Sequence, residues 1–504
     1  MKNILDYLEK TEQQYPNATA VDDGSLRLTW KELADQSRRI GTTFAKKVKP
    51  GKPVVILAEK SSITLAAMFG VVYAGCFYVI VDPAQPLARI QEMFQVLEPE
   101  LVVVNDKSRE ILKQTSDRKK IYLLKEEQNE AVDRDLLMEI RRKSQETDLL
   151  YGIFTSGSTG TPKGIVVSHR AVIDFIIHFT YIFQFESCDR IGNQAPFDFD
   201  VSVKDIYTSV FTGAALILIP KELFSTPPVL LDYLCEKEIT TLIWAVSALS
   251  LVAALKGLNY KVPKEVKKIL FSGEVMPVKQ LRMWQEALPR AEFVNLYGPT
   301  EITCNCTYHP IRGMVSDGEK IPIGRPFPGR TVFLLDDKGK KITVSGTIGE
   351  ICVAGESLSE GYYHNTEETK KRFLCYSVQK EKEERYYKTG DLGYYGDDGE
   401  LYFSGRRDFQ IKHMGHRIEL EEIERALEQI HGLERSCCVM DTKRNKIIAF
   451  YLGEIPLNEI KKQLREIVPA YMIPHKIVKT ELMPLNKNGK TDREYFRQKI
   501  RGNV

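Results

Sequence analysis

Apolar, β-branched runs alternate with helical patterns through the first three hundred residues. The clearest runs are KPVVILAE (Lys52–Glu59), ELVVVND (Glu100–Asp106), AALILIP (Ala214–Pro220) and VKKILFSGE (Val266–Glu274). Runs without polar alternation suit strands that helices cover on both faces, as in a parallel sheet. The stretch from Leu65 to Val81 contains two glycines and ends in DPAQP, which predicts a helix and then a strand, not a membrane span. The sequence therefore predicts an α/β fold.

The pattern changes twice in the last two hundred residues. From about residue 321 to 404, short strands and turns such as DDKGKK and GDDGE predict a small β-barrel-like subdomain. Further on, RIELEEIERALEQI places Ile423, Leu427 and Ile430 on one helical face. A chain of 504 residues is too long for one core. We expect an N-terminal domain of layered α/β subdomains over 1–405, which includes the β-rich part, and a small mobile α+β domain over 406–504.

The charge balance argues against a nucleic-acid or membrane surface. The 71 Lys and Arg residues nearly balance 68 Asp and Glu residues, for a formal net charge of +3. The run from Gln379 to Arg385 alternates in sign and predicts a solvated turn or strand edge. Acidic residues interrupt the amphipathic N-terminal pattern MKNILDYLEKTEQQYP, so we interpret it as a helix and not a signal peptide.

The cysteines show no metal-binding or disulfide framework. The nine cysteines include no C-x-x-C pair. We interpret CNC (Cys304, Cys306) and CC (Cys437, Cys438) as small buried apolar side chains. Reduced thiols without an export signal predict a cytoplasmic protein, which we expect to be a monomer.

A glycine- and hydroxyl-rich loop, Thr155–Gly164, separates two extended segments in YGIFTSGSTGTPKGIVVSH. Backbone N–H groups of such a loop, with Ser and Thr hydroxyls, can bind phosphate oxygens, and Lys163 adds a point charge. The loop is not a Walker A sequence, because Lys163 follows a proline and precedes Gly164. The alternative is a polar loop over a sheet edge that binds no ligand.

The string TSGSTGTPKG resembles the signature loop of the adenylate-forming superfamily, which contains acyl-CoA synthetases, luciferases and amino-acid adenylation domains. Further motifs of that superfamily are present in order and cover nearly the whole chain. They are LTWKEL (Leu28–Leu33), AGCFYVIVDPAQP (Ala74–Pro86), FDVS (Phe199–Ser202), NLYGPTE (Asn295–Glu301), GEICVAGESLSEGYY (Gly349–Tyr363), YKTGDL (Tyr387–Leu392), GRRDFQIKHMGHRIELEEIE (Gly405–Glu424), VPAYMIP (Val468–Pro474) and NKNGKTDR (Asn486–Arg493).

The resemblance implies a reaction in two halves. A carboxylate attacks the α-phosphorus of ATP to give an acyl-adenylate and pyrophosphate, and a thiol then displaces AMP to form a thioester. The first half brings two anions together, so it needs cations and oriented donors. Lys490 in NGKTD matches the catalytic lysine of the family, Thr300 the α-phosphate contact, and Glu301 the ligand of Mg²⁺ on the phosphates.

The resemblance also assigns the nucleotide site. In the loop, Thr155, Ser156, Gly157, Ser158, Thr159, Gly160 and Lys163 would hold the β- and γ-phosphates. Outside the loop, the expected ATP-binding residues are Gly273, Glu274, Asn295, Leu296, Tyr297, Gly298, Thr300, Asp391, Arg406 and Lys490. Tyr297 would lie against adenine, and Asp391 would accept hydrogen bonds from the ribose hydroxyls. Asp408 matches the hinge of the C-terminal domain, and Gly415 would approach the pantetheine arm.

Two features imply an amino-acid substrate. Asp200 in FDVS matches the aspartate that pairs with the substrate α-ammonium, since a cation in a partly dry pocket needs a counter-charge. GRRDFQIK resembles the branch that loads carrier proteins. No carrier-protein motif is present, so we expect a separate phosphopantetheinylated carrier protein as partner. By position, the substrate pocket would comprise Asp200, Val201, Lys204, Ile243, Leu270, Ser272, Leu296, Cys304, Asn305 and Lys490.

The identity of the substrate stays open at this point. The chain resembles both D-alanine–carrier protein ligases and the adenylation domains of nonribosomal peptide synthetases. D-Alanine ligases have a cysteine at the position of Ser272, a Met-like residue at Lys204 and an alanine-like residue at Asn305. Lys204 either pairs with Asp200 or reaches solvent, or else Lys204 and Asn305 receive a polar or acidic side chain. An acyl-CoA synthetase and a non-catalytic adenylate-binding protein are the alternatives of another class.

If Lys490 is the catalytic lysine, its mutation should affect the two half-reactions of the enzyme differently. Lys490→Ala should stop adenylation, measured by ATP–pyrophosphate exchange, because the lysine would bridge the substrate carboxylate and the α-phosphate. Thioester formation from a preformed adenylate should be largely spared. An equal loss of both half-reactions would contradict the assignment.

Overall fold

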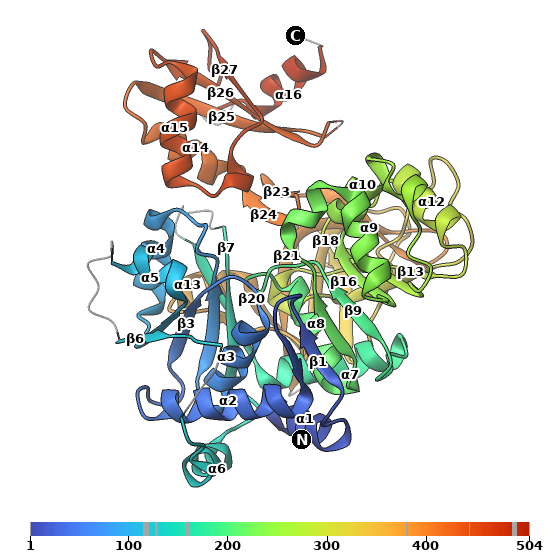
Figure 1. Cartoon of the computed structure of the whole chain (residues 1–504). Helices are drawn as coiled ribbons and strands as arrows, with labels where there is room; N and C mark the ends of the chain where they lie inside the picture. Colours follow the sequence, from blue (N-terminus) through green and yellow to red (C-terminus); the bar gives the residue numbers. More distant parts are fainter. Residues whose placement is uncertain are drawn as a thin grey trace. The chain divides into compact units, whose positions relative to one another are not determined.

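The computed structural model describes residues 2–113, 120–126, 130–156, 162–379, 382–442, 444–485 and 491–502. The chain forms two compact units, which are described separately below. One consists of Met1–Pro83, Leu97–Ile153 and Ile165–Arg407, and the other of Ala84–Val96, Phe154–Gly164 and Asp408–Val504. The elements are labelled in Figure 1.

The first unit contains a mixed sheet with strand order β15-β14-β13-β12-β11-β9-β10-β1-β2. Its strands are β1 (Thr19–Asp22), β2 (Arg27–Thr29), β9 (Arg190–Asn193), β10 (Ala215–Leu218), β11 (Thr241–Ala245), β12 (Lys268–Ser272), β13 (Glu292–Tyr297), β14 (Thr307–Ile311) and β15 (Arg325–Pro326). The strands from β1 to β13 in this order run parallel, and β2, β14 and β15 are antiparallel additions at the two edges. The carboxyl ends of β11, β12 and β13 therefore meet at one edge.

A second sheet has the order β19-β8-β7-β4-β3-β5-β6. It contains β3 (Pro53–Leu57), β4 (Phe77–Val81), β5 (Leu101–Val104), β6 (Lys120–Leu123), β7 (Leu149–Thr155), β8 (Lys163–Ser168) and β19 (Gly361–Tyr362). Every residue of β3, β4 and β5 is buried. Continuous burial explains the uninterrupted Val, Ile and Leu runs, because both faces of these parallel strands are covered.

The third sheet is wholly antiparallel. Its order is β17-β16-β18-β21-β20, with β22 paired to β21. The strands are β16 (Arg330–Leu335), β17 (Lys341–Ile342), β18 (Gly349–Gly355), β20 (Phe373–Gln379), β21 (Lys382–Tyr395) and β22 (Leu401–Arg406). The register shifts within β18–β21 and β21–β22, which bends the sheet, as β-bulges do. The β-barrel-like subdomain predicted from the sequence is present as this curled antiparallel sheet.

Helices cover the parallel sheets of the first unit. They are α1 (Ile4–Gln14), α2 (Trp30–Ala45), α3 (Ser62–Tyr73), α5 (Asp106–Leu112), α6 (Arg134–Lys143), α7 (His169–Ile182), α8 (Val201–Thr212), α9 (Pro227–Glu236), α10 (Val246–Ala254), α11 (Gly257–Tyr260), α12 (Val278–Ala287) and α13 (Thr366–Arg372), with 3₁₀ turns η1 (Lys221–Ser225) and η2 (Thr300–Ile302). In Figure 1, α9, α10 and α12 lie together beside the sheet. Their apolar residues form one core with Trp244 of β11 and Phe271 of β12. The opposite strand face packs with α8 in the main core.

The second unit is a small α+β body. It contains α4 (Leu87–Leu97), the hairpin β23 (Gln410–His413) and β24 (His416–Glu419), and the sheet β25 (Leu433–Asp441), β26 (Lys446–Gly453) and β27 (Lys476–Lys479). Helices α14 (Leu420–Glu428), α15 (Leu457–Ile467) and α16 (Arg493–Arg501) and the turn η3 (Ala470–Met472) complete it. Arg493 pairs with Glu424 of α14, and the two side chains are mostly buried.

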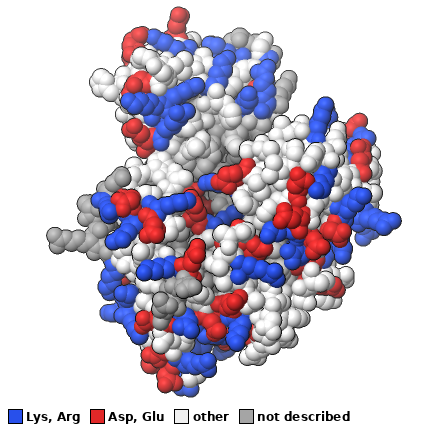
Figure 2. Space-filling model, in the orientation of Figure 1, with Lys and Arg blue, Asp and Glu red and all other residues white. Residues whose placement is uncertain are grey.

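The expected elements are present with small differences at their ends. The N-terminal pattern forms α1, and the stretch from Leu65 to Val81 forms the end of α3 followed by β4. Ile423 and Leu427 lie buried on α14, but Ile430 follows the helix, which ends at Glu428 before the chain turns at Gly432 with φ 90°. No helix among the described residues is long and apolar enough to cross a membrane. Figure 2 shows acidic and basic side chains interspersed on the face in view.

A buried histidine should make the first unit sensitive to acid. His169 begins α7, and its Nδ1 accepts a hydrogen bond of 3.2 Å from the backbone N–H of Ile4. Burial and the charge of the nearby Arg141 together lower the pKa of His169 to about 3, against the opposite effect of Asp6. Since the unfolded chain takes up the proton near pH 6.5 and the folded state does not, His169 should remove stability as pH falls below 6.5. Between pH 6.5 and 5 the loss should be about 2 kcal/mol.

The measurement is urea unfolding of wild type and His169→Gln at pH 7 and pH 5. Glutamine can accept the same hydrogen bond but does not titrate, so the variant should lose less stability on acidification. His364→Gln, which changes an exposed histidine of the same unit, should keep the wild-type dependence. Equal pH dependence of wild type and His169→Gln would refute the prediction.

Candidate active site

The substrate residues predicted on strands lie on one face of the first sheet, from the middle of its strands to their carboxyl edge. Ile243 of β11 pairs in register with Leu270 of β12, and Ala245 pairs with Ser272. Leu270 is in turn opposite Val294, so Leu296 follows two residues later on the same face of β13. Carboxyl edges of parallel strands are where ligands bind in open α/β sheets.

Helix α8 packs against the face of the sheet that carries these residues. Asp200 is its N-terminal capping residue, and the left-handed Gly213 ends it. Every residue from Ser202 to Val210 is buried, although the helix contains Lys204 and Asp205. Charged side chains are rarely buried in this way unless they are paired. We therefore expect Lys204 and Asp205 to have hydrogen-bond partners inside the protein.

The Lys204 side chain points inward, toward the end of β12 and the turn after β13. Lys204 is 1% exposed, and its ammonium donates to Ser272 Oγ at 3.1 Å and to Asn305 Oδ1 at 2.8 Å. The alternative that Lys204 reaches solvent is therefore wrong, and its hydrogen bonds go to Ser272 and Asn305 instead of Asp200. Burial lowers the pKa of Lys204, while the carboxylates of Asp200 and Asp205 act in the opposite direction.

Behind Lys204 lies a buried polar chain that the sequence did not reveal. Asp205 Oδ2 accepts a 2.6 Å hydrogen bond from the Asn193 amide, whose Oδ1 accepts one of 3.0 Å from Lys60. Burial raises the pKa of Asp205 to about 7, against the effect of the Asn193 hydrogen bond and the two lysines. The only signal in the sequence is a pair of adjacent charges, Lys204 and Asp205, inside an otherwise buried helical run.

The turn after β13 carries the remaining predicted substrate residues, Cys304 and Asn305. A Cβ at Gly298 would lie 2.5 Å from Asn305 Cα and 2.7 Å from the Cys304 carbonyl oxygen, so only glycine lets this turn fold back on the strand. Thr303 and Cys304 adopt positive φ values of 53° and 73°, which side chains other than glycine seldom do. The Cys304 thiol donates to the Asp200 carbonyl at 3.0 Å, which fastens the turn to the start of α8.

Three of the predicted nucleotide residues are joined directly. The Tyr297 hydroxyl donates to Asp391 Oδ2 at 2.6 Å, and Arg406 forms an ion pair with Oδ1 of the same carboxylate. Asp391 and Arg406 are cross-strand partners on β21 and β22. Burial raises the pKa of Tyr297 well above its usual value, and the Asp391 charge adds to the shift. The motifs YGPTE and TGDL, almost a hundred residues apart, therefore meet at one point.

Glu301, the predicted metal ligand, is fully buried in η2 and accepts a 2.9 Å hydrogen bond from the Tyr362 hydroxyl. Tyr362 lies in the predicted motif that ends at Tyr363, but no sequence pattern links it to Glu301. The described residues contain no cluster of three or more metal-ligating side chains. Mg²⁺ does not require one, because it is held by one or two carboxylates together with substrate phosphates.

The other predicted residues have the following positions. Asn295 donates to the Pro322 carbonyl at 2.8 Å, and Gly273, with φ 100°, follows β12 directly before Glu274. Val201 begins α8 and Thr300 begins η2, both half-buried. Thr155 ends β7, Lys163 begins β8, and the Ser156 hydroxyl donates to the Arg417 carbonyl within the second unit. Asp408 is the first residue of the long segment of that unit. Gly157, Ser158, Thr159, Gly160 and Lys490 lie outside the described residues.

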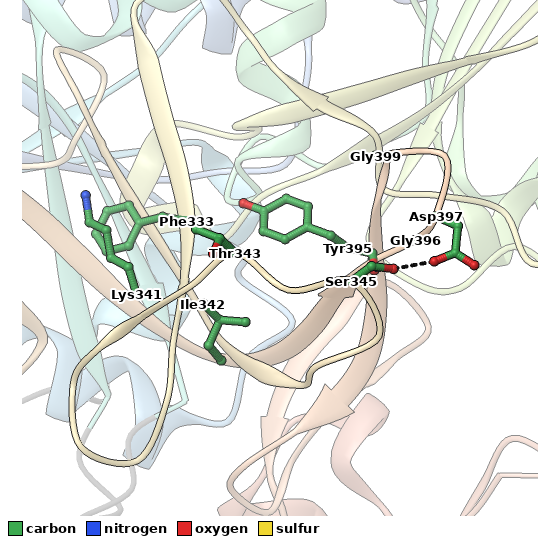
Figure 3. A pocket seen from close by; sticks show the side chains of 9 residues that line it. All are labelled: Phe333, Lys341, Ile342, Thr343, Ser345, Tyr395, Gly396, Asp397 and Gly399. Atoms are coloured by element: carbon green, nitrogen blue, oxygen red, sulfur yellow. Dashed lines mark hydrogen bonds between the residues drawn. The ribbon is translucent and has the colours of Figure 1, made fainter.

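A separate hollow of about 530 Å³ lies on the third sheet, between β16, β17 and the turn after β21 (Figure 3). Lys341, Tyr395 and Asp397 are among its lining residues, and Ser345 donates to Asp397 at 2.6 Å. It contains none of the predicted site residues, so it is not the candidate active site.

The fold and the meeting of these motifs define the class of protein. Layered α/β sheets bring Lys204, Ser272 and Asn305 together beside the carboxyl edge, and a curled antiparallel sheet brings Asp391 and Arg406 to the YGPTE turn. This is the arrangement of an adenylate-forming enzyme. The chain belongs to the AMP-binding enzyme family, whose model matches residues 8–363, and it is an adenylating ligase that uses ATP.

Relatives agree with this assignment over almost the whole chain. D-alanine--D-alanyl carrier protein ligase from Staphylococcus haemolyticus (strain JCSC1435) is 30% identical over 511 residues, which cover 99% of this chain and 100% of the relative. Bacitracin synthase 1 from Bacillus licheniformis is 33% identical over 499 residues, which cover 98% of this chain. The chain spans only 9% of the length of that synthase.

The fold is also that of a solved structure. The Vibrio cholerae adenylation domain AlmE, in complex with glycyl-adenosine-5'-phosphate, has a TM-score of 0.86 and 22% sequence identity, and the match covers 100% of this chain and 98% of AlmE. The predicted α/β fold with a curled β subdomain and a C-terminal α+β region is confirmed.

The close approach at Gly298 makes a specific prediction. Gly298→Ala should lower ATP–pyrophosphate exchange at least tenfold, because the new Cβ would push the backbone of Cys304 and Asn305 away from Asp200 and Lys204. It should also destabilise the first unit by about 1–3 kcal/mol, measured by urea unfolding. Gly318→Ala is the control for activity: a Cβ there meets no atom within 4 Å, so exchange should be retained, although its φ of 80° means that the variant also loses some stability. Equal activity of both variants would show that the turn does not set the pocket.

Proposed function

We propose that this protein activates an amino acid with ATP and Mg²⁺ to give aminoacyl-AMP and pyrophosphate, and transfers the aminoacyl group to the phosphopantetheine thiol of a separate carrier protein. The observation that carries the proposal is the pair of charges at the start of α8. Asp200 lies half-buried at its N-terminus beside the carboxyl edge of the sheet, one turn before the buried Lys204. An α-ammonium that enters such a pocket needs a carboxylate beside it.

In this proposal, residues of the first unit bind the nucleotide. Tyr297 would lie against adenine, and the Asp391 carboxylate, held by Tyr297 and Arg406, would accept hydrogen bonds from the ribose. Thr300 would contact the α-phosphate. Glu301 would bind Mg²⁺, which neutralises charge on the phosphates while the carboxylate attacks.

Transfer to a carrier protein is supported by the full-length match to a D-alanine--D-alanyl carrier protein ligase and by the sequence GRRDFQIK. In this proposal Asp408 acts as the hinge about which the C-terminal domain, residues 406–504, reorients between the half-reactions. The first half-reaction takes place at the α-phosphorus and releases pyrophosphate, whereas in the second the thiol attacks the acyl carbon and releases AMP, so one domain has to present different groups in turn. Thioester formation with a phosphopantetheinylated carrier protein and not with free coenzyme A would support the proposal over an acyl-CoA synthetase.

The side chain of the substrate is polar or acidic in this proposal. Lys204, Ser272 and Asn305 line the pocket with hydrogen-bonding groups. D-Alanine is the second candidate, favoured by the full-length relative. It fits this pocket less well, because a methyl group makes no use of a buried ammonium.

The direct test is ATP–pyrophosphate exchange with the twenty L-amino acids, D-alanine and fatty acids. Exchange should depend on an amino acid. Exchange supported only by fatty acids would overturn the proposal, and ATP binding without any exchange would favour a non-catalytic protein.

Asp200→Asn should lower kcat/KM for the amino acid at least a hundredfold, because the α-ammonium loses its counter-charge on the way into the pocket. The binding of ATP alone, measured by calorimetry, should be nearly unchanged. Asp198→Asn, two residues away in the same segment, is the matched control and should retain most activity. If Asp200→Asn and Asp198→Asn have the same kcat/KM, then Asp200 does not bind the ammonium.

A further inference from the structure

We propose that the amino acid activated by this protein carries a carboxylate in its side chain, and that Lys204 binds that carboxylate. The inference rests on the proposed function, since it concerns the substrate of the same pocket. The proposed function allows a polar or an acidic substrate side chain, and the inference restricts this choice to an acidic side chain of the aspartate or glutamate type.

Hydrogen bonds to the described residues use only part of the donor capacity of the Lys204 ammonium. An ammonium has three N–H donors, and two of them are used by the hydroxyl of Ser272 and the amide oxygen of Asn305. Within the part of the chain that the structure describes, Lys204 makes no salt bridge. Both partners are neutral, so the charge itself is not compensated by them. A buried cation of this kind needs an anion.

The nearby carboxylate of Asp205 has a hydrogen-bond partner other than Lys204. Asp205 does not face the same way as Lys204, because adjacent helical residues point to different sides. Its carboxylate bonds to Asn193, which also accepts from Lys60. Asp205 lies near both Lys60 and Lys204, and Asp200 also lies near Lys204, but among the described residues neither carboxylate accepts a hydrogen bond from the Lys204 ammonium. A side-chain carboxylate of the substrate would supply that direct contact.

The neighbouring strand residues of the substrate site are apolar and offer Lys204 no further hydrogen-bond acceptor in their side chains. Ile243, Leu270 and Leu296 are each at most 2% exposed and offer no hydrogen-bonding side chain. A substrate amide or hydroxyl could accept the third N–H, but only a carboxylate would bring a negative charge into direct contact with the ammonium in this dry, apolar place. A carboxylate supplies both the acceptor and the charge, and charged hydrogen bonds are roughly twice as strong as neutral ones.

The experiment compares isosteric pairs in ATP–pyrophosphate exchange: L-aspartate with L-asparagine, and L-glutamate with L-glutamine. In at least one pair kcat/KM should favour the acid by tenfold or more. Exchange with amino acids in which amides, hydroxylated residues or D-alanine match or exceed the acids would overturn this inference and leave the proposed function intact. Exchange with no amino acid at all would overturn both.

Two variants test the role of Lys204 itself through the ratio of acid to amide, which does not depend on the folded fraction. Lys204→Met removes the charge and should lower the ratio at least tenfold. Asn305→Asp keeps the shape of the pocket but gives Lys204 an internal carboxylate, and it should lower the ratio at least as much. This second variant decides the matter if Lys204→Met does not fold.

The matched control is Lys268→Met. Lys268 is the first residue of β12, at the opposite end of the strand from Ser272, and pairs with Asp189. The same substitution there should leave the ratio of acid to amide unchanged. A ratio that stays at the wild-type value in both Lys204→Met and Asn305→Asp would overturn the inference.

Discussion

The structure of the pocket depends on burying a lysine ammonium inside an almost wholly buried helix. Lys204 cannot reach water, so Ser272 at the end of β12 and Asn305 in the turn after β13 must both lie within its reach. One side chain thereby fixes the positions of a helix, a strand end and a turn relative to one another. Leaving such a charge without any partner would cost several kcal/mol, which explains why these three segments have to be positioned together.

The surrounding fold makes that convergence possible with few special residues. Parallel pairing brings the carboxyl ends of β11, β12 and β13 to one edge, and Gly298 lets the following turn fold back against β13. The same turn carries Tyr297 at its start, which reaches Asp391 on the antiparallel third sheet. Substrate and nucleotide residues are thus placed by the two ends of one short segment, and a change in that segment affects both.

Much of this could be predicted from the sequence, and the limits have physical causes. The buried strands β3, β5, β10 and β12 are evident as continuous β-branched runs, and the ordered motifs pointed to the family. The direction of Lys204 could not be predicted, because helical spacing puts it on the face of Asp200 whether it turns inward or reaches solvent. The link from Asp205 through Asn193 to Lys60 reaches a residue 133 positions before Asn193, and no local pattern signals such a contact. The roles of the Thr155–Gly164 loop, Lys490 and Asp408 stay predictions.

The central claim is that one amino acid is held at two points, by Asp200 at its ammonium and by Lys204 at its side chain. A crystal structure of the protein with a non-hydrolysable aspartyl- or glutamyl-adenylate analogue would test this most directly. The account predicts the α-ammonium within hydrogen-bonding distance of the Asp200 carboxylate and the side-chain carboxylate within hydrogen-bonding distance of Lys204 Nζ. A bound analogue whose side chain points away from Lys204, with the ammonium distant from Asp200, would contradict it.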